Sequence, residues 1–423
     1  MAKRYYYINK AITVKTLFWR HLFMVNAYDK LINMKYQSKL LLGLIQKKGP
    51  VTRNQIMDAT GMKLTTLKRF MQPLLDEEFI IEADIGKSTG GRPPALYDVN
   101  PGGFYVIGID ISRTYTETVI TNLKMGIIDL HRFESPHDPE DTVNQISLYL
   151  EDSLHRLGIA KSFVLGAGIG TVGPLDREEG IILNPANFPS NSWINVPIRD
   201  MFKEKLSLPI VIDNGANTAV LAEHLFGTGK GIDNMSYFQC GVGIRTGAIS
   251  SGGIVRAINE YEDAFGHMVI DINGELCHCG NRGCIETMCS IPSITKKFKK
   301  LLEQRNLSSI NEPLDRIDYL YICNAAEQGD KLAKETIVNA ATRFGIGLAN
   351  YINLINPELV VLSGPLIEHS PLFYKTGVEV ASRRRYMKNS RVTFSRGGYF
   401  KDKAIAVGAA ALLVEEILAS QDV

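Results

Sequence analysis

The stretch GHMVIDINGELCHCGNRGCIETMCS, residues 266–290, decides the fold of this chain. It places one imidazole and three thiols within eighteen consecutive positions: His267, Cys277, Cys279 and Cys284. One nitrogen and three thiolates are donors that a structural Zn²⁺ ion takes in closed tetrahedral sites, which keep no position open for an activated water. We therefore expect a structural zinc site. The alternative is a set of free buried cysteines beside a core histidine.

The composition predicts a globular protein of two or three domains. The chain has 423 residues, and 47 Lys and Arg against 45 Asp and Glu leave a net charge of +2, so any contact with nucleic acid must come from a local patch. No apolar run reaches the roughly 18 residues that span a bilayer, and we expect no membrane contact. Four of the six cysteines lie within thirteen residues, which favours a metal site in a reducing cytoplasm over disulfides.

Residues 1–34 form an extension without a predicted role. They are basic and aromatic, but they lack the apolar core and the small-residue cleavage site of an export signal. Two interpretations stay open: an arm that touches DNA, or sequence that lies ahead of a later start at Met24 or Met34.

Residues 35–100 have the pattern of a winged helix-turn-helix domain. The run SKLLLGLIQKKG predicts a first helix that Gly49 closes, and four of its apolar side chains share one face: Leu40, Leu41, Leu44 and Ile45. Thr52 can cap a short second helix that ends at Gly61, and a third helix is expected from about Lys63 to Glu78. This spacing of helices is typical of a helix-turn-helix.

The predicted third helix offers a polar face that suits DNA. Its outward positions near the start carry donors for phosphates and base edges: Lys63, Thr65, Thr66, Lys68 and Arg69. Its inward positions are apolar: Leu67, Phe70, Met71, Leu74 and Leu75. Pro73 removes one backbone hydrogen bond and is expected to kink the helix. The alternative is a solvated basic face without a partner.

A basic hairpin is expected after this helix. Two strand-like stretches, Phe79–Ile85 and Ala95–Val99, flank a glycine-rich turn that carries Lys87 and Arg92 at its tip. Arg92 stands between Gly91 and Pro93 on a narrow backbone, which suits insertion of its guanidinium into an A·T-rich minor groove. A wing of this kind predicts contact with double-stranded DNA; a plain linker is the alternative.

An α/β body is predicted from residue 104 onward. The segment FYVIGIDISRTYTETVITNLKMGII, residues 104–128, predicts a strand, a turn and a second strand. Strand-like segments at 163–173, 209–220, 235–249 and 357–366 end in glycine turns, as strands beside nucleotide and sugar clefts often do. Their number and order favour a ligand-binding α/β body.

These features together resemble the ROK family of repressors, open reading frames and sugar kinases, from about Tyr36 to Val414. The resemblance lies in G-H-x9-C-x-C-G-x2-G-C-x-E at 266–286, DNGAN at 213–217, NPANFPSNSWINVPI at 184–198, and a GGRPP wing at 90–94 that resembles the family's repressor branch. It implies an actin-like (ribonuclease H-like, hexokinase-type) body of two α/β lobes. The first lobe is expected at 104–220, completed by a last helix at about 404–419 within residues 400–423, and the second lobe at 221–399 with the zinc loop.

The resemblance also implies a lost catalytic base. Family kinases carry a general-base aspartate after the asparagine of the 213–217 segment, and this chain has Gly215 there. Loss of a general base costs about 10²–10⁴-fold in rate. The family's two phosphate loops, D-x-G-G-T and T-G-x-G, are Asp110-Ile111-Ser112-Arg113-Thr114 and Cys240-Gly241-Val242-Gly243 here, so Ser112 and Arg113 replace two glycines and Cys240 replaces a threonine. No catalytic residue is therefore expected; an active ATP-dependent sugar kinase is the alternative.

The resemblance carries four sugar-binding residues over to this chain: Asn187, Asn214, His267 and Glu286. The glutamate that the family places three residues before the histidine is Ala264 here, so one acceptor for vicinal hydroxyls is missing. The resemblance implies a bacterial, nucleoid-associated transcriptional repressor of carbohydrate-metabolism genes that acts as a homodimer or homotetramer and responds to a sugar or sugar-derivative effector. A regulator controlled by a protein partner near the zinc loop is a further alternative.

Overall fold

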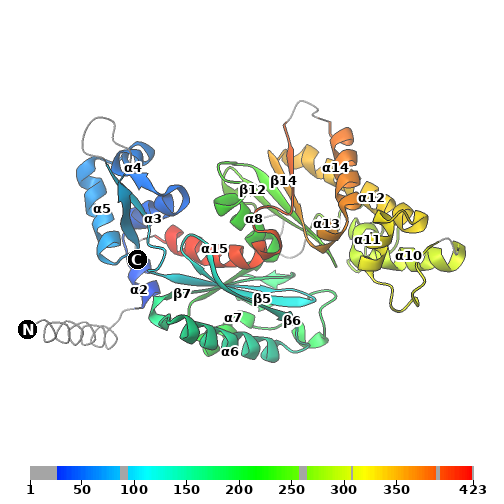
Figure 1. Cartoon of the computed structure of the whole chain (residues 1–423), viewed down its shortest axis with the longest axis horizontal. Helices are drawn as coiled ribbons and strands as arrows, with labels where there is room; N and C mark the ends of the chain where they lie inside the picture. The colour runs from blue at the N-terminus through cyan, green and yellow to red at the C-terminus, as the bar shows by residue number, and fades with distance from the viewer. Residues whose placement is uncertain (1–25, 86–93, 257–263, 306–307, 387–390, 422–423) are drawn as a thin grey trace, which may run out of the picture.

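The structure is a computed structural model that describes residues 26–85, 94–256, 264–305, 308–386 and 391–421. It consists of a small N-terminal unit and two larger lobes, each built on its own sheet (Figure 1). Within the described residues, no helix combines the length and the apolar character needed to cross a membrane.

The N-terminal unit consists of short helices and a small antiparallel sheet. Its elements are α2 (Ala27–Ile32), α3 (Tyr36–Lys48), β1 (Val51–Thr52), α4 (Arg53–Thr60), α5 (Leu64–Asp76), β2 (Ile80–Ile85) and β3 (Ala95–Val99), and its strand order is β1-β3-β2. The predicted cap is confirmed: Thr52 forms a capping box with Gln55 at the start of α4. The predicted end is confirmed as well, because Gly61 adopts a left-handed φ of 68°.

Two details of the predicted helices are wrong. Leu40 is 45% exposed, and the buried side chains of α3 include Leu41, Leu42 and Ile45. The buried face is rotated because α3 packs against α5 on one side and the C-terminal helix on another. Helix α5 continues through Pro73 and ends at Asp76 rather than Glu78, since Glu78 takes a left-handed φ of 60° that a helix cannot include.

The first lobe is a five-stranded sheet with helices on both faces. Its strands are β4 (Tyr105–Ile111), β5 (Tyr115–Asn122), β6 (Ile127–Glu134), β7 (Val164–Thr171) and β10 (Ile210–Asn214), in the order β10-β7-β4-β5-β6. Helices α6 (Pro139–Leu157) and α7 (Ile198–Leu206) pack on one face, while α8 (Gly215–Phe226) and α15 (Ala404–Ala419) pack on the other. A two-strand pair, β8 (Leu175–Asp176) and β9 (Ile181–Ile182), lies outside the sheet. The sequence indicated β4 and β5 but not β6.

The second lobe repeats this design with a five-stranded sheet of its own. Its strands are β11 (Met235–Cys240), β12 (Ile244–Ser250), β13 (Gly253–Ile254), β14 (Leu359–Ser363) and β15 (Thr393–Arg396), in the order β13-β12-β11-β14-β15. Its helices are α9 (Glu286–Cys289), α10 (Ile291–Arg305), α11 (Tyr319–Glu327), α12 (Lys331–Ile355), α13 (Pro365–His369) and α14 (Pro371–Arg384). A core around Phe238, Phe265 and Phe344 joins several of these helices to the sheet.

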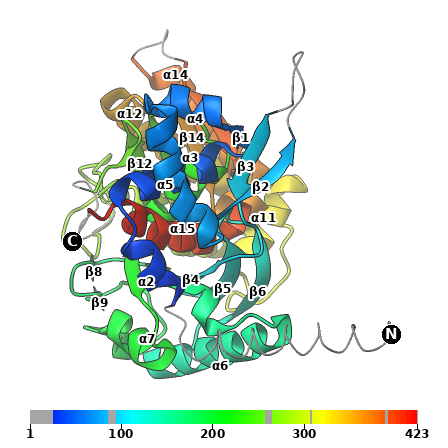
Figure 2. The ribbon, with the colours of Figure 1, turned by 90° about the vertical axis from the view of Figure 1, so that its left-hand side faces the viewer.

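Helix α15 lies at the centre of the molecule and contacts all three units. In Figures 1 and 2 it runs from the space between the two lobes to the N-terminal unit. It packs closely on the first sheet because two strand positions there have no side chain: a Cβ at Gly108 would lie 1.9 Å from Ala406 O, and one at Gly168 would lie 1.8 Å from Ala409 O. Its other end packs on α3. The helix that the sequence placed at about 404–419 is thus confirmed.

Candidate functional site

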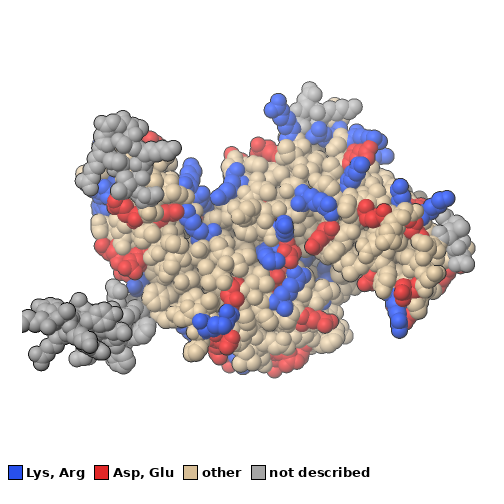
Figure 3. Space-filling view, viewed as in Figure 1, with Lys and Arg blue, Asp and Glu red and all other residues tan. Residues whose placement is uncertain are grey.

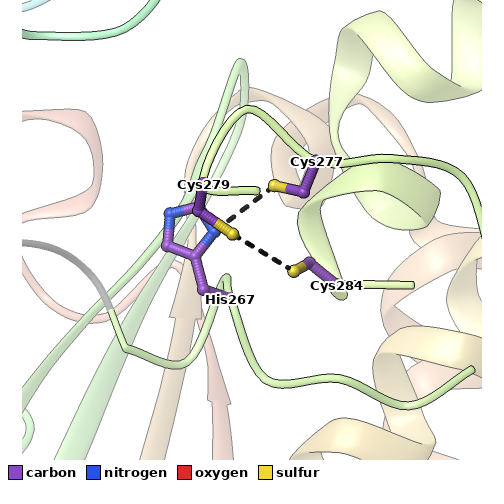
Figure 4. Close-up of side chains that lie close together, drawn as sticks. All are labelled: His267, Cys277, Cys279 and Cys284. Atoms are coloured by element: carbon purple, nitrogen blue, oxygen red, sulfur yellow. Dashed lines mark hydrogen bonds between the residues drawn. The ribbon is translucent and has the colours of Figure 1, made fainter. Parts of the chain in front are cut away.

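The predicted zinc ligands converge in one loop of the second lobe (Figure 4). Cys277 Sγ lies 3.5 Å from His267 Nδ1, and Cys279 Sγ lies 3.6 Å from Cys284 Sγ. All four ligand atoms fall within 4.8 Å of one another. A tetrahedron with metal–sulfur bonds of about 2.3 Å separates its sulfur atoms by roughly 3.8 Å, so these residues fit a tetrahedral Zn²⁺ ion.

The backbone of this loop holds the ligands in place. Cys277 N donates to Asn281 O at 2.7 Å and closes the turn that carries Cys279. Gly283 has a φ of 70°, and a Cβ there would lie 1.6 Å from Asp271 O, so only glycine fits beside Cys284. Burial raises the pKa of the Cys284 thiol to about 12, and a metal ion must therefore displace its proton on binding.

His278 connects the metal loop to the proposed sugar residue Glu286. Its Nε2 lies 3.3 Å from Glu286 Oε1, and its ring meets the His267 ring edge-on at a centroid distance of 4.9 Å. The other carboxylate oxygen, Oε2, accepts a hydrogen bond from Ile244 N at 3.2 Å. Glu286 thus bridges the metal loop and the start of β12. The sequence did not single out His278.

The remaining predicted sugar residues lie on loops of the first lobe. Asn214 ends β10 and caps α8, because its Oδ1 accepts from Ala216 N at 2.9 Å. Asn187 is exposed and adopts a left-handed φ of 59° in the loop after β9. Arg113, at the end of β4, donates through Nε to Ala186 O at 2.8 Å and so ties that loop to the strand edge. Ala264 is exposed at the edge of the described second lobe.

A row of charged side chains crosses the first sheet beside these loops. The pairing register places Asp213 opposite Gly170, Gly170 opposite Asp110, Asp110 opposite Glu117, and Glu117 opposite Arg132. Residues opposite one another on neighbouring strands project from the same face. Because β4, β7 and β10 are parallel, the row lies toward their carboxyl ends, where ligands of α/β proteins bind.

Two carboxylates of this row are deeply buried. Burial raises the pKa of Asp110 to about 6, while the positive charge of Arg245 opposes the shift. Burial and the nearby charge of Asp110 raise the pKa of Glu117 to about 7. Arg132 Nη1 lies 3.6 Å from Glu117 Oε2. The sequence analysis missed Glu117, Arg132 and Arg245.

Gly215, where the sequence predicts that the catalytic base is missing, faces an arginine. A Cβ at Gly215 would lie 3.2 Å from Arg245 Nη1. Arg245 is only 5% exposed. Arg245 comes two residues before Gly247 on β12, and Gly247 packs on the start of α8. Because side chains two apart on a strand share a face, Arg245 lies on the face of β12 that meets α8. A charged residue inside an otherwise buried strand was the signal that could have revealed Arg245.

The positions that the sequence matches to the family's two phosphate loops lie close together. A Cβ at Gly243 would lie 2.8 Å from both Arg113 Nη1 and Glu286 Oε2, so the Arg113 guanidinium lies against the second loop. Cys240 is fully buried, and burial raises the pKa of its thiol far above the usual range. A phosphate-binding loop of this kind presents its backbone N–H groups to the phosphate. Here the Arg113 side chain takes up part of the space beside the loops.

The predicted DNA-facing side chains of α5 are exposed. The exposed residues are Lys63, Thr65, Thr66, Lys68 and Arg69. Leu67, Met71 and Leu74 are buried, as predicted, whereas Phe70 and Leu75 are only partly buried. Helix α5 lies toward the viewer in Figure 2, on the outside of the N-terminal unit. Lys87 and Arg92 lie outside the described residues.

Charge is mixed over much of the surface. On the face seen in Figure 3, Lys and Arg alternate with Asp and Glu over both lobes. Several pairs are close, such as Lys124 with Asp98 at 2.6 Å and Lys47 with Glu415 at 3.0 Å. This agrees with the small net charge, and it leaves α5 as the local patch to which the sequence points.

The two lobes, each an α/β layer around a shared pair of helices, define an actin-like protein of the hexokinase type. A profile of the ROK family matches residues 106–416. The chain belongs to the ROK family, and the predicted fold class is confirmed.

The similar proteins include both repressors and kinases. The chain is 29% identical over 395 residues to the xylose repressor of Caldicellulosiruptor bescii, covering 91% of this chain and 97% of that protein. It is 26% identical over 382 residues to the DNA-binding transcriptional dual regulator NagC of Escherichia coli, covering 89% and 91%.

Solved structures show the same fold. A ROK family transcriptional regulator, a homologue of the Escherichia coli MLC protein, has a TM-score of 0.76 at 23% identity and covers 92% of this chain and 97% of its own. A ROK family glucokinase from Streptomyces griseus, solved with glucose and AMPPNP, has a TM-score of 0.61 at 26% identity and covers 73% and 98%. The kinase lacks a counterpart to about a quarter of this chain.

Proposed function

We propose that this protein is a sequence-specific transcriptional repressor of carbohydrate-metabolism genes whose cleft binds a sugar or sugar-derivative effector. One observation carries the proposal: a helix with an exposed row of Lys, Arg and Thr is joined through α15 to a kinase-like cleft that has glycine in place of its base. The relatives that cover about 90% of the chain are named as repressors or DNA-binding regulators, which supports it.

In this proposal the chain divides by function as its sequence suggests. Residues 35–100 are the winged helix-turn-helix domain, with α5 as the recognition helix in the major groove. Residues 104–220 with 400–423, and residues 221–399, are the two lobes that close on the effector. The protein presents two such domains as a homodimer or homotetramer, so that a pseudo-palindromic operator has half-sites separated by whole helical turns of roughly 34 Å.

Helix α15 supplies a physical connection between the cleft and the DNA-binding domain. At one end, a Cβ at Gly215 would lie 3.3 Å from Ile405, so α15 touches the start of α8 in the cleft. At the other end, Leu418 packs on α3, where a Cβ at Gly43 would lie 3.2 Å from it. A change of 5- to 150-fold in operator affinity needs only about 1–3 kcal/mol of coupling, which a small shift of this rigid helix can transmit.

Catalysis is lost in this proposal. The general base is absent at Gly215, Arg113 replaces a glycine of the first phosphate loop and lies against the second, and Cys240 is buried where the family has threonine. An active sugar kinase is the competing function, and a coupled assay with ATP and a hexose panel separates the two. Turnover near 1 s⁻¹ or above, which working enzymes reach, would contradict the proposal.

The metal in this proposal is a structural Zn²⁺ ion held by His267, Cys277, Cys279 and Cys284. Four protein donors complete the coordination shell, so the ion fixes the loop and supplies no reactive water. Through His278 it sets the position of Glu286 beside the cleft.

A protein partner is the second candidate for the signal. Three apolar side chains of the metal loop are exposed: Val269 at 42%, Ile272 at 80% and Leu276 at 62%. Exposed apolar clusters often mark contact sites.

The test of the proposed function is operator release. DNA selected from a random-sequence library by the purified protein is bound in gel shifts, and a sugar panel is added. Release by a sugar supports the proposal. If tight, salt-dependent DNA binding persists with every sugar, the protein-partner alternative is favoured, and failure to select any DNA contradicts the repressor assignment.

A further inference from the structure

Arg245 is a buried cation whose hydrogen-bonding capacity is not used within the described part of the chain. It is 5% exposed, and its Nη1 has no hydrogen-bond partner there. That nitrogen points to the first residue of α8, because a Cβ at Gly215 would lie 3.2 Å from it. A buried donor without an acceptor is unfavourable, so a ligand that brings an acceptor to this point gains affinity.

The amino end of α8 is itself suited to negative charge. Helix α8 has twelve residues, and its first backbone N–H groups and its dipole favour an anion. The cap residue Asn214 satisfies Ala216 N, and Gly215 leaves the helix end open on the side that faces Arg245. In a kinase of this fold a carboxylate would fill that side.

We propose that the effector carries an anionic group, a phosphate ester or a carboxylate attached to a sugar, and that this group binds between Arg245 and the amino end of α8. The inference rests on the proposed function and names the chemical class of the effector. A sugar held by Asn187, Asn214, His267 and Glu286 then directs its charged substituent toward the place of the missing base. A neutral sugar leaves Arg245 unsatisfied.

The neighbouring charges set the strength of this site. The Asp213 carboxylate already has partners: it accepts hydrogen bonds from Asn214 N and Asn217 Nδ2, and it forms an ion pair with Arg256 at 3.2 Å. Glu117 pairs with Arg132. The carboxylate that would repel an anion bound beside Arg245 is therefore that of Asp110.

Asp110 adapts to the anion rather than excluding it. Burial already raises the pKa of Asp110 to about 6. An arriving anion raises it further, because a like charge disfavours the ionised form. The protonated carboxyl then becomes a hydrogen-bond donor to the ligand.

Isothermal calorimetry tests the proposal with matched ligand pairs. The panel contains D-glucose, N-acetyl-D-glucosamine and D-xylose, their terminal phosphate esters, D-gluconate and inorganic phosphate. We expect at least one phosphate ester or sugar acid to bind ten times more tightly than its neutral parent. Preference for the ester identifies phosphate, and preference for gluconate identifies carboxylate. Equal or tighter binding of neutral sugars, or no binding by any member, overturns the proposal.

Two variants locate the anion. Arg245→Gln should reduce the preference for the charged ligand at least tenfold, and Arg245→Lys should restore part of it. Gly215→Asp keeps Arg245 but places a carboxylate beside its Nη1, so it should abolish the preference even if Arg245→Gln folds poorly. Arg177→Gln, an exposed arginine paired with Glu416 at 3.4 Å, is the charge-matched control. An unchanged preference in Gly215→Asp and in folded Arg245→Gln overturns the proposed location.

Gel shifts on the same variants separate this inference from the proposed function. Without ligand, the control variant Arg177→Gln should bind the selected DNA as the unaltered protein does. If the unaltered protein does not bind DNA, the proposed repressor function is contradicted. If it binds DNA but shows no preference for anionic ligands, only the proposed chemical class of the effector is contradicted.

Discussion

Lys39 and Ser420 are 381 positions apart in the chain, and Lys39 Nζ donates a hydrogen bond to Ser420 Oγ at 2.8 Å. The lysine is completely buried, and it donates a second hydrogen bond to Ile32 O at 3.2 Å. This contact fastens α3 of the N-terminal unit to the end of α15. Because Ile405 at the other end of α15 lies beside Gly215, this helix connects the two proposed binding sites.

We therefore expect Lys39→Met to loosen the N-terminal unit. The change keeps most of the side-chain volume but removes the lysine's hydrogen bonds to Ile32 O and Ser420 Oγ, at a cost of about 1–3 kcal/mol. The melting temperature should fall, and the ligand should release DNA less effectively. Lys48→Met, at an exposed lysine of the same helix, is the control. Equal melting temperatures for both variants would show that the buried contact contributes nothing.

The recognition face of α5 predicts two different effects on DNA binding. Arg69→Ala should weaken binding to selected DNA by about 1–3 kcal/mol if the guanidinium reads a base, and Lys68→Ala should lower the slope of log affinity against log salt by about 1 if the ammonium contacts a phosphate. Gel shifts at several salt concentrations measure both. Lys331→Ala, exposed at the start of α12 in the second lobe, should change neither. Full affinity in both α5 variants would rule out this docking face.

The metal loop allows a substitution that separates zinc binding from contact with the effector. Cys279→Ser removes an exposed ligand without disturbing the core, so the purified protein should hold less zinc and melt at a lower temperature. His278→Ala should keep zinc, because it removes no predicted ligand, and should lose the contacts with Glu286 and with the His267 ring. Metal analysis and calorimetry with the best ligand of the panel measure the two effects. One full equivalent of zinc in Cys279→Ser would mean that the ligand set is wrong.

The buried carboxylate Glu117 predicts a pH dependence of stability. Its pKa is raised from 4.5 to about 7 in the folded protein, so its contribution to stability is present below about pH 4.5 and is lost as the pH rises through 7. Glu117→Gln cannot ionise, and it should therefore gain melting temperature relative to the unaltered protein between pH 5 and pH 8.

The control for this prediction is Glu134→Gln, an exposed glutamate on β6. Its melting temperature should differ from that of the unaltered protein by the same small amount at every pH. A constant difference for Glu117→Gln as well would show that Glu117 titrates normally.

Local patterns accounted for much of what the sequence predicted. Thr52, Gln55 and Gly61 define α4 because caps depend on residues three or four apart. The metal ligands lie within eighteen positions, so their spacing alone indicated a shared site. Strand β6 and the exposure of Leu40 were missed, since a half-exposed strand and a helix with two packing partners give mixed periodicity.

The sequence by itself determined the capped helix α4 and the convergence of His267, Cys277, Cys279 and Cys284, because each depends on neighbouring residues or on a match to a known motif. Only the tertiary structure decided that Arg245 faces Gly215, that Asp110, Glu117 and Asp213 share one face, and that Lys39 reaches Ser420. Those relationships depend on strand register and on helix packing between segments up to 381 residues apart, which local side-chain pattern does not encode.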